Sequence, residues 1–78
     1  MNNKKMDYRT LGTYIRKRRE NLNVSLNEFA IITDTDPAIL SRIENLKQNI
    51  KLNVLEKISS GFNLTPAKFL TEFENNKF

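Results

Sequence analysis

The chain has 78 residues, enough for one domain with a thin core, so dimerisation would help to stabilise it. It contains no cysteine and no histidine, which excludes disulfides and thiolate metal sites and removes the commonest general base and metal ligand. Its formal net charge is +4, which favours a nucleic-acid partner through counterion release, although solubility alone also calls for a net charge away from zero. We therefore expect no metal site, no cofactor and no enzymatic centre.

The first residues, MNNKKMDYRT, carry charges but lack the apolar segment of a secretion signal. No apolar run approaches the length that spans a membrane. The sequence therefore predicts a cytoplasmic protein with no membrane contact.

A first helix is predicted over about residues 8–22, with Asp7 as its N-cap and a frayed polar segment, residues 1–6, before it. Its buried face is expected to carry the apolar residues that recur at helical spacing, Leu11, Ile15 and Leu22.

A basic run from Arg16 to Arg19 lies in this helix, but consecutive helical residues point in different directions. The run is therefore not a single patch, and we expect Lys17 and Arg18 to be solvated. Arg9 and Arg16 share one face of the helix, because they are seven residues apart.

The centre of the chain contains two helix-start signals a short turn apart. Ser25 followed by Glu28 is a capping box before an apolar segment, and Asp36 followed by Pro37 is an N-cap with proline at the first helical position. Residues 33–35, between them, are poor helix formers that favour a turn. The sequence predicts two short helices joined by a tight turn, over about residues 25–45.

These two helices need small or apolar residues where they cross. Phe29 and Ala30 end the inward face of the first helix, and Leu40 and Ile43 form that of the second. Ala30 has no side chain beyond Cβ, so the second helix can approach it closely.

A polar loop over residues 45–51 precedes a predicted fourth helix over about 52–62, after which Asn63 can take the left-handed conformation. The buried stripe of this helix is expected to be Leu52, Leu55, Ile58 and Phe62. Thr65 and Pro66 start a fifth helix. Its apolar face is Ala67, Phe69, Leu70 and Phe73, and we expect residues 75–78 to be flexible.

From Leu11 to about Leu70, the chain resembles the Cro and phage-repressor type of helix-turn-helix regulator, the XRE family. The residues that carry the match are Ser25, Glu28, Phe29, Ala30, Asp36, Leu40, Ser41, Arg42, Ile43, Glu44 and Lys47. The layout is most like that of small restriction–modification controller proteins. The resemblance implies a compact all-α bundle of about five helices, a lambda-repressor-like domain over residues 1–78.

The resemblance also implies a double-stranded DNA partner and a recognition helix that reads bases in the major groove. The exposed candidates for base readout are Asp36, Pro37, Ala38, Ser41 and Arg42. Arg42 is the strongest, because arginine can bond guanine O6 and N7 together, although it could instead hold a phosphate. The candidates for phosphate contacts are Asn45, Lys47, Gln48, Lys51, Arg9 and Arg16.

In the resembling family, the arginine that matches Arg19 pairs with the glutamate that matches Glu44, and we interpret this pair as structural. The alternative is that Arg19 only contacts phosphate.

A homodimer on a palindromic operator would read two half-sites. Phe69 and Leu70 are expected to serve mainly the core and Phe73 mainly the dimer interface, unless Phe73 merely closes the end of the bundle.

Several residues depart from the family pattern. Leu26 replaces a usual phosphate-binding glutamine, and Asp34 and Leu46 replace usual glycines. Ile31 and Ile32 stand at usually polar positions, so they are exposed or the helix rotates to bury one. The leading hypothesis is a sequence-specific transcriptional regulator that is not an enzyme. The alternative is a protein-interaction module, or an antitoxin subunit, with Leu26, Ile31 and Ile32 as its docking patch.

Overall fold

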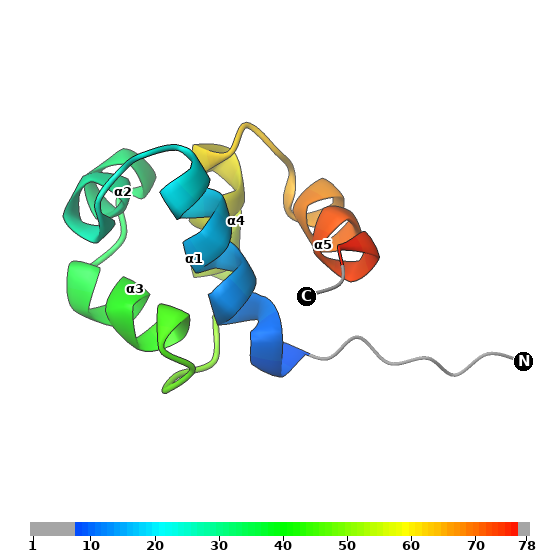
Figure 1. Ribbon diagram of the computed structural model, residues 1–78, viewed down its shortest axis with the longest axis horizontal. Helices are drawn as coiled ribbons and strands as arrows, with labels where there is room; N and C mark the ends of the chain where they lie inside the picture. Colours follow the sequence, from blue (N-terminus) through cyan, green and yellow to red (C-terminus); the bar gives the residue numbers. More distant parts are fainter. Residues whose placement is uncertain (1–7, 77–78) are drawn as a thin grey trace, which may run out of the picture.

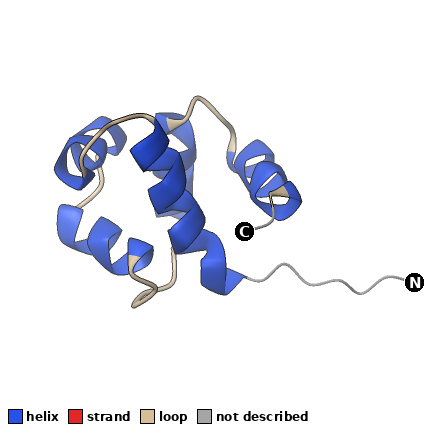
Figure 2. Ribbon diagram, viewed as in Figure 1, coloured by secondary structure: helices blue, strands red, loops and turns tan. Residues whose placement is uncertain are grey.

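Five α-helices, preceded by a single 3-10 turn, make up the part of the chain that the computed structural model describes, residues 8–76 (Figure 1). The 3-10 turn η1 is Tyr8–Thr10, and the helices are α1 (Leu11–Asn21), α2 (Leu26–Thr33), α3 (Pro37–Glu44), α4 (Leu52–Gly61) and α5 (Pro66–Asn75). Within these residues there is no strand (Figure 2). The prediction of an all-α bundle of five helices is confirmed.

Helix α1 runs through the middle of the molecule, with α2 and α3 on one side of it and α5 on the other (Figure 1). Helix α3 packs against both α1 and α2, while α4 packs against α2 and α5. This arrangement leaves one long face of α3 uncovered at the edge of the bundle.

Three helices begin with the caps that the sequence predicts. The Ser25 side chain accepts from the Glu28 N–H at 3.1 Å, while the Glu28 carboxylate accepts from the Ser25 N–H at 2.8 Å, so the capping box is complete. Asp36 caps α3, and Thr65 caps α5. Each cap satisfies backbone donors that a helix start leaves without a partner.

Three helices end with one hydrogen-bond pattern, the Schellman motif, in which a left-handed residue reverses the chain. The left-handed residues are Asp34 after α2, Leu46 after α3 and Asn63 after α4, with φ of 53°, 61° and 60°. At the end of α3, the N–H of Lys47 donates to the carbonyl of Arg42 and that of Leu46 to the carbonyl of Ile43. Asn63 therefore takes its predicted conformation, and the loop after α3 folds back on the helix although it has no glycine.

The core lies where all five helices meet. Its buried apolar residues are Leu11, Tyr14, Ile15, Phe29, Ala30, Leu40, Ile43, Leu55, Ile58, Phe69 and Phe73. The Phe62 ring joins two parts of this core, because it lies 4.9 Å from the Phe29 ring and 5.5 Å from the Phe69 ring, between centroids. Aromatic packing thus connects α2 to α5 through the end of α4.

Two glycines allow close helix contacts. A Cβ on Gly12 would overlap the carbonyl oxygen of Ile43, so α1 can meet the end of α3 only because position 12 has no side chain. A Cβ on Gly61 would lie 2.6 Å from Cγ2 of Thr33, so the missing side chain at position 61 lets α4 pack closely against α2. Both contacts fix the position of the helix-turn-helix pair in the bundle.

Some sequence expectations were wrong at the ends of elements. Leu22 and Leu52 are exposed rather than buried, because Leu22 follows the last residue of α1 and Leu52 is the first residue of α4. Asn75 belongs to α5 and is not part of a loose tail. The predicted cap Asp7, residues 1–6 and residues 77–78 lie outside the described residues.

Arg18 was expected to be solvated, but it connects α1 to α5. Its guanidinium donates to the Tyr14 hydroxyl and to the Glu72 carboxylate, each at 2.7 Å, and stacks 5.0 Å from the centroid of the Phe62 ring. The sequence pattern could not reveal this role, because Glu72 lies 54 residues away.

Candidate nucleic-acid interface

The N-terminal half of α3 presents short, exposed side chains. Asp36, Pro37 and Ala38 are all exposed, and each of them has a short side chain. An oxygen of Asp36 accepts from the Ala38 N–H at 2.8 Å, so capping occupies the acid that would otherwise face phosphates. This end of the helix offers little steric hindrance to a DNA groove, and it offers few donors for reading bases.

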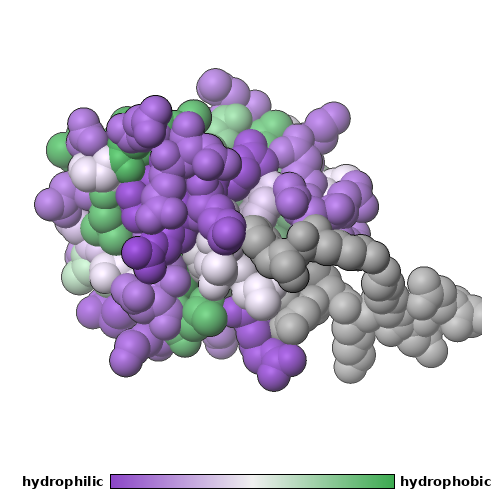
Figure 3. All heavy atoms as spheres, viewed as in Figure 1, coloured by the Kyte–Doolittle hydropathy of each residue, from purple (hydrophilic) through white to green (hydrophobic). Residues whose placement is uncertain are grey.

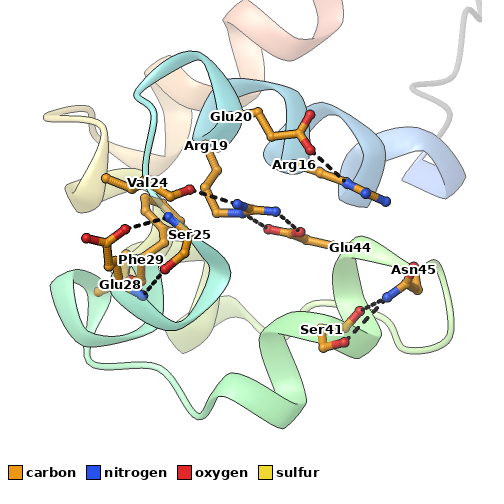
Figure 4. A network of polar contacts seen from close by, with 11 residues as sticks. Arg16, Arg19, Glu20, Val24, Ser25, Glu28, Phe29, Ser41, Glu44 and Asn45 are labelled. Carbon is orange, nitrogen blue, oxygen red and sulfur yellow. Dashed lines mark hydrogen bonds and ion pairs between the residues drawn. The ribbon is translucent and has the colours of Figure 1, made fainter.

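The C-terminal half of α3 carries the longer polar groups. Arg42 is exposed, and its Nε donates to Oε1 of Gln48 at 2.9 Å. Ser41 is half-buried, and the Asn45 amide donates to its carbonyl at 2.8 Å (Figure 4). Arg42 is the one residue of α3 with several strong donors, as the sequence predicted.

The loop after α3 places further cations beside this helix. Lys47 and Lys51 are exposed, and no ion pair holds either of them within the described residues. Two other predicted phosphate contacts are engaged within the chain, since Asn45 bonds Ser41 and Gln48 bonds Arg42. The loop therefore combines two exposed positive charges with two amides that order the end of α3.

The two predicted flanking arginines differ in their surroundings. Arg16 donates to Glu20 one turn along α1 at 3.2 Å, and both side chains are about half exposed. Arg9 is exposed in the 3-10 turn, on the same open side of the molecule as Gln48. An exposed pair such as Arg16–Glu20 is weak, so it does not prevent Arg16 from meeting a phosphate.

Arg19 and Glu44 form a bidentate pair that joins α1 to α3 (Figure 4). Nε and Nη2 of Arg19 donate to the two carboxylate oxygens at 2.8 and 3.0 Å, and Nη1 donates to the Val24 carbonyl at 2.8 Å. The side chains are only 10% and 2% exposed. The hydrogen bonds to Glu44 raise the pKa of Arg19, so its guanidinium keeps its positive charge. With all three nitrogens engaged, Arg19 is built into the scaffold and does not act merely as a phosphate ligand.

Two buried threonines, Thr33 and Thr35, lie where α2 ends and the chain turns toward α3. The Thr33 hydroxyl donates to the Phe29 carbonyl at 2.7 Å and contacts the Thr35 hydroxyl at 2.9 Å, so these buried hydroxyls are satisfied. The two isoleucines of α2 stay outside, with Ile31 81% and Ile32 56% exposed. Of the two alternatives for them, the structure selects exposure.

Hydrophobic residues are visible at the corner of the displayed face where α2 lies, and smaller hydrophobic spots lie elsewhere on a mostly hydrophilic surface (Figure 3). Leu26, at the start of α2, is only half-buried. The patch is on the other short helix of the motif, away from the donors of Arg42 and the loop.

The predicted dimer residues were assigned wrongly in part. Phe69 and Phe73 are 0% and 5% exposed, and both rings pack on Tyr14 with centroids 5.5 and 5.4 Å away. Phe73 is therefore a core residue with almost no surface for a partner. Leu70 alone of the three keeps some exposure.

Leu70 lines an open cavity of about 720 Å³ between η1, the loop after α3 and α4. Three exposed apolar residues share its walls, namely Tyr8, Leu46 and Leu52. Sequence reasoning missed this surface. One signal for this surface was available in the sequence. Leucine disfavours the left-handed conformation that position 46 needs, so its presence there suggests that its apolar side chain has a role.

No helix within residues 8–76 is both long enough and apolar enough to cross a membrane.

Comparisons with known proteins agree with this geometry. A helix-turn-helix family model matches residues 15–69, which include α2, α3 and α4 entirely. The chain is also similar to the control protein C.MunI of Mycoplasma sp, with 38% identity over 64 residues that make up 81% of this chain and 86% of that relative.

Proposed function

Because the chain belongs to the helix-turn-helix family of the Cro and phage-repressor type, whose members are DNA-binding transcription regulators, we propose that it is a sequence-specific regulator of a restriction–modification system. It acts as a homodimer on a palindromic operator, by binding and not by catalysis. The likeness to a control protein supports the restriction–modification setting.

The observation that carries the proposal is the uncovered face of α3 with the cations beside it. Arg42 offers its guanidinium from this face, while Lys47 and Lys51 stand exposed in the loop that follows. The Arg19–Glu44 pair holds α3 against α1, so the face is presented rigidly. Arg42 reads a guanine, and the lysines contact phosphates on either side of the groove.

The experiment that tests the proposal compares two lysine variants on a duplex that the protein selects from random-sequence DNA. Lys47→Ala should weaken binding to all sequences about equally and reduce the slope of log K against log salt by about 1. Lys68→Ala, which removes an exposed lysine from α5, should leave the slope unchanged. Binding without salt dependence, or equal effects of both variants, would contradict this interface.

The homodimer is supported by the apolar cavity that Leu70 shares with Leu46 and Leu52 at the C-terminal end of α3. A dimer that reads half-sites one helical turn apart needs its two recognition helices about 34 Å apart. Leu52→Glu should dissociate the dimer without unfolding it, because Leu52 is 73% exposed. Ile31→Glu, on α2, is the matched control. Sedimentation that finds a monomer at tens of micromolar, or no effect of Leu52→Glu, would argue against this interface.

A protein-docking function is the second candidate, and the exposed Ile31 and Ile32 favour it. Such a module would need no salt-dependent affinity for duplex DNA, so the lysine experiment separates the two functions.

A further inference from the structure

Gln48 lies six residues after Arg42, and the two side chains meet over the folded-back loop. The Arg42 Nε donates to Oε1 of Gln48 at 2.9 Å. An arginine has only donors, so it must face the amide oxygen of Gln48 and not the nitrogen. The loop brings the two together because the Lys47 N–H returns to the Arg42 carbonyl at 2.8 Å.

This contact leaves the two terminal nitrogens of Arg42 without a partner within residues 8–76. Guanine presents two acceptors in the major groove, O6 and N7, which the two ends of an arginine fork can bond together. Nε is not needed for that contact. The hydrogen bond to Gln48 therefore occupies the one nitrogen that base recognition can spare.

We infer that Gln48 is a positioning residue that fixes the Arg42 fork for guanine before DNA arrives. The inference rests on the proposed function and deepens it, since it names what sets the specificity of Arg42. A long arginine side chain loses rotamer freedom on binding, and prior ordering reduces that loss. Gln48 can impose this order because it is half-buried, against the cavity that Leu46 and Gly12 also line.

Gln48 was predicted from the sequence to hold a phosphate, and the two roles have different consequences. A phosphate contact contributes to affinity for every duplex, whereas a positioning contact contributes to discrimination at the guanine that Arg42 reads. The bond in the structure uses the amide oxygen, which a phosphate could not bond, so the oxygen of Gln48 serves Arg42.

The test measures the ratio of dissociation constants for two duplexes, the one selected from random DNA and the same one with the Arg42 guanine replaced. Gln48→Ala should lower this ratio severalfold, toward the value for Arg42→Ala, with little change in the salt slope. Gln48→Glu keeps an acceptor for Nε, so it should preserve the ratio while its negative charge weakens binding to both duplexes. Asn49→Ala, an exposed amide in the same loop, is the matched control and should change neither quantity.

The effect must also depend on Arg42. In an Arg42→Ala background, Gln48→Ala should leave the ratio unchanged. Equal loss of affinity for both duplexes, or the same effect with and without Arg42, would overturn the inference while leaving the DNA-binding function intact. If Arg42→Ala itself leaves the ratio unchanged, the direct readout in the proposed function fails, and the inference fails with it.

Discussion

Leu46 has a backbone conformation that its side chain disfavours. Its φ of 61° lies in the left-handed region, where a Cβ approaches the following carbonyl and a non-glycine residue costs about 1–2 kcal/mol. The conformation is nevertheless required, because it reverses the chain at the end of α3 and brings the loop back to Arg42. The side chain that incurs this cost lies exposed at the cavity that we assign to the dimer.

Leu46→Gly should therefore raise the free energy of unfolding by about 1 kcal/mol, as glycine relieves the left-handed strain. The same change removes an apolar side chain from the proposed dimer surface and should weaken self-association. Urea unfolding of dilute protein measures the first effect, and sedimentation measures the second. A variant that is less stable as a monomer would show that Leu46 contributes more by packing than it costs by strain.

Gly61 illustrates how packing can reverse a helix preference. Alanine inside a helix is favoured over glycine by about 1 kcal/mol, so the sequence alone makes this position a weak point of α4. In the structure, an added Cβ would lie 2.6 Å from Thr33 Cγ2 and 3.1 Å from a ring carbon of Phe29. Thr33 cannot easily yield, because it is buried and its hydroxyl is hydrogen-bonded to Phe29 and Thr35.

We expect Gly61→Ala to lower the free energy of unfolding by about 1–2 kcal/mol, since overpacking typically costs more than the helix preference returns. Thermal unfolding of this variant beside Ser60→Ala, an exposed neighbour on α4, measures the effect. A raised melting temperature of Gly61→Ala would contradict this account, because it would mean that α2 and α4 can shift apart to accommodate the added methyl group at little cost.

At the scale of helices, one ion pair holds the recognition helix in place. Arg19 comes from α1 and Glu44 ends α3, and the same guanidinium bonds the Val24 carbonyl just before α2. One side chain thus joins three segments of the motif. Buried charges of this kind are costly to leave alone, because a single partner retains its desolvation penalty without its compensating bonds.

Glu44→Ala should destabilise the protein by about 3 kcal/mol, and Arg19→Ala by a similar amount. The double variant should cost less than the sum, because neither buried charge is then left alone. Chemical unfolding of all four proteins gives the coupling energy. A coupling near zero would mean that the pair does not lock α1 to α3.

The capping box of α2 makes the stability of this helix depend on pH. The Ser25 N–H donates to the Glu28 carboxylate, and this bond lowers the pKa of Glu28 below its ordinary value of 4.5. A lowered pKa in the folded state means that the stabilisation is present above the unfolded pKa and is lost as the pH falls through the folded pKa. The start of α2 should therefore loosen in acid.

Glu28→Gln retains an acceptor for the Ser25 N–H but cannot titrate. The stability difference between the wild type and this variant should favour the wild type at neutral pH and shrink as the pH falls below about 4.5. Unfolding free energies measured across the acidic range give the comparison. A constant difference at every pH would show that the ionised carboxylate contributes nothing to the cap.

At the scale of the whole molecule, local signals predicted more than long-range ones. The caps at Ser25, Asp36 and Thr65 involve partners within three residues, so the sequence was enough to predict them. Phe73 and Arg18 were misjudged, because Phe73 packs on Tyr14 and Arg18 bonds Glu72, and each of these partners lies more than 50 residues away along the chain. Helical spacing shows which residues share one face of a helix, but it does not show which other helix packs against that face.

The candidate site shows the same division. Helix preferences and the family resemblance point to α3, to Arg42 and to the loop lysines from the sequence alone. The bond between Arg42 and Gln48 could not be foreseen, because it depends on how Leu46 reverses the chain. The apolar cavity likewise brings together residues from η1, the loop after α3, α4 and α5.

With so few donors on α3, much of the specificity must come from one arginine and from the shape of the operator between the half-sites. The most direct test is the binding of Arg42→Ala to the selected operator and to operators altered at each guanine in turn. We predict a loss of about 1–3 kcal/mol and of discrimination at one guanine per half-site, with discrimination elsewhere retained. If affinity instead falls equally for every operator, Arg42 contacts the phosphate backbone, and α3 does not read the sequence through it.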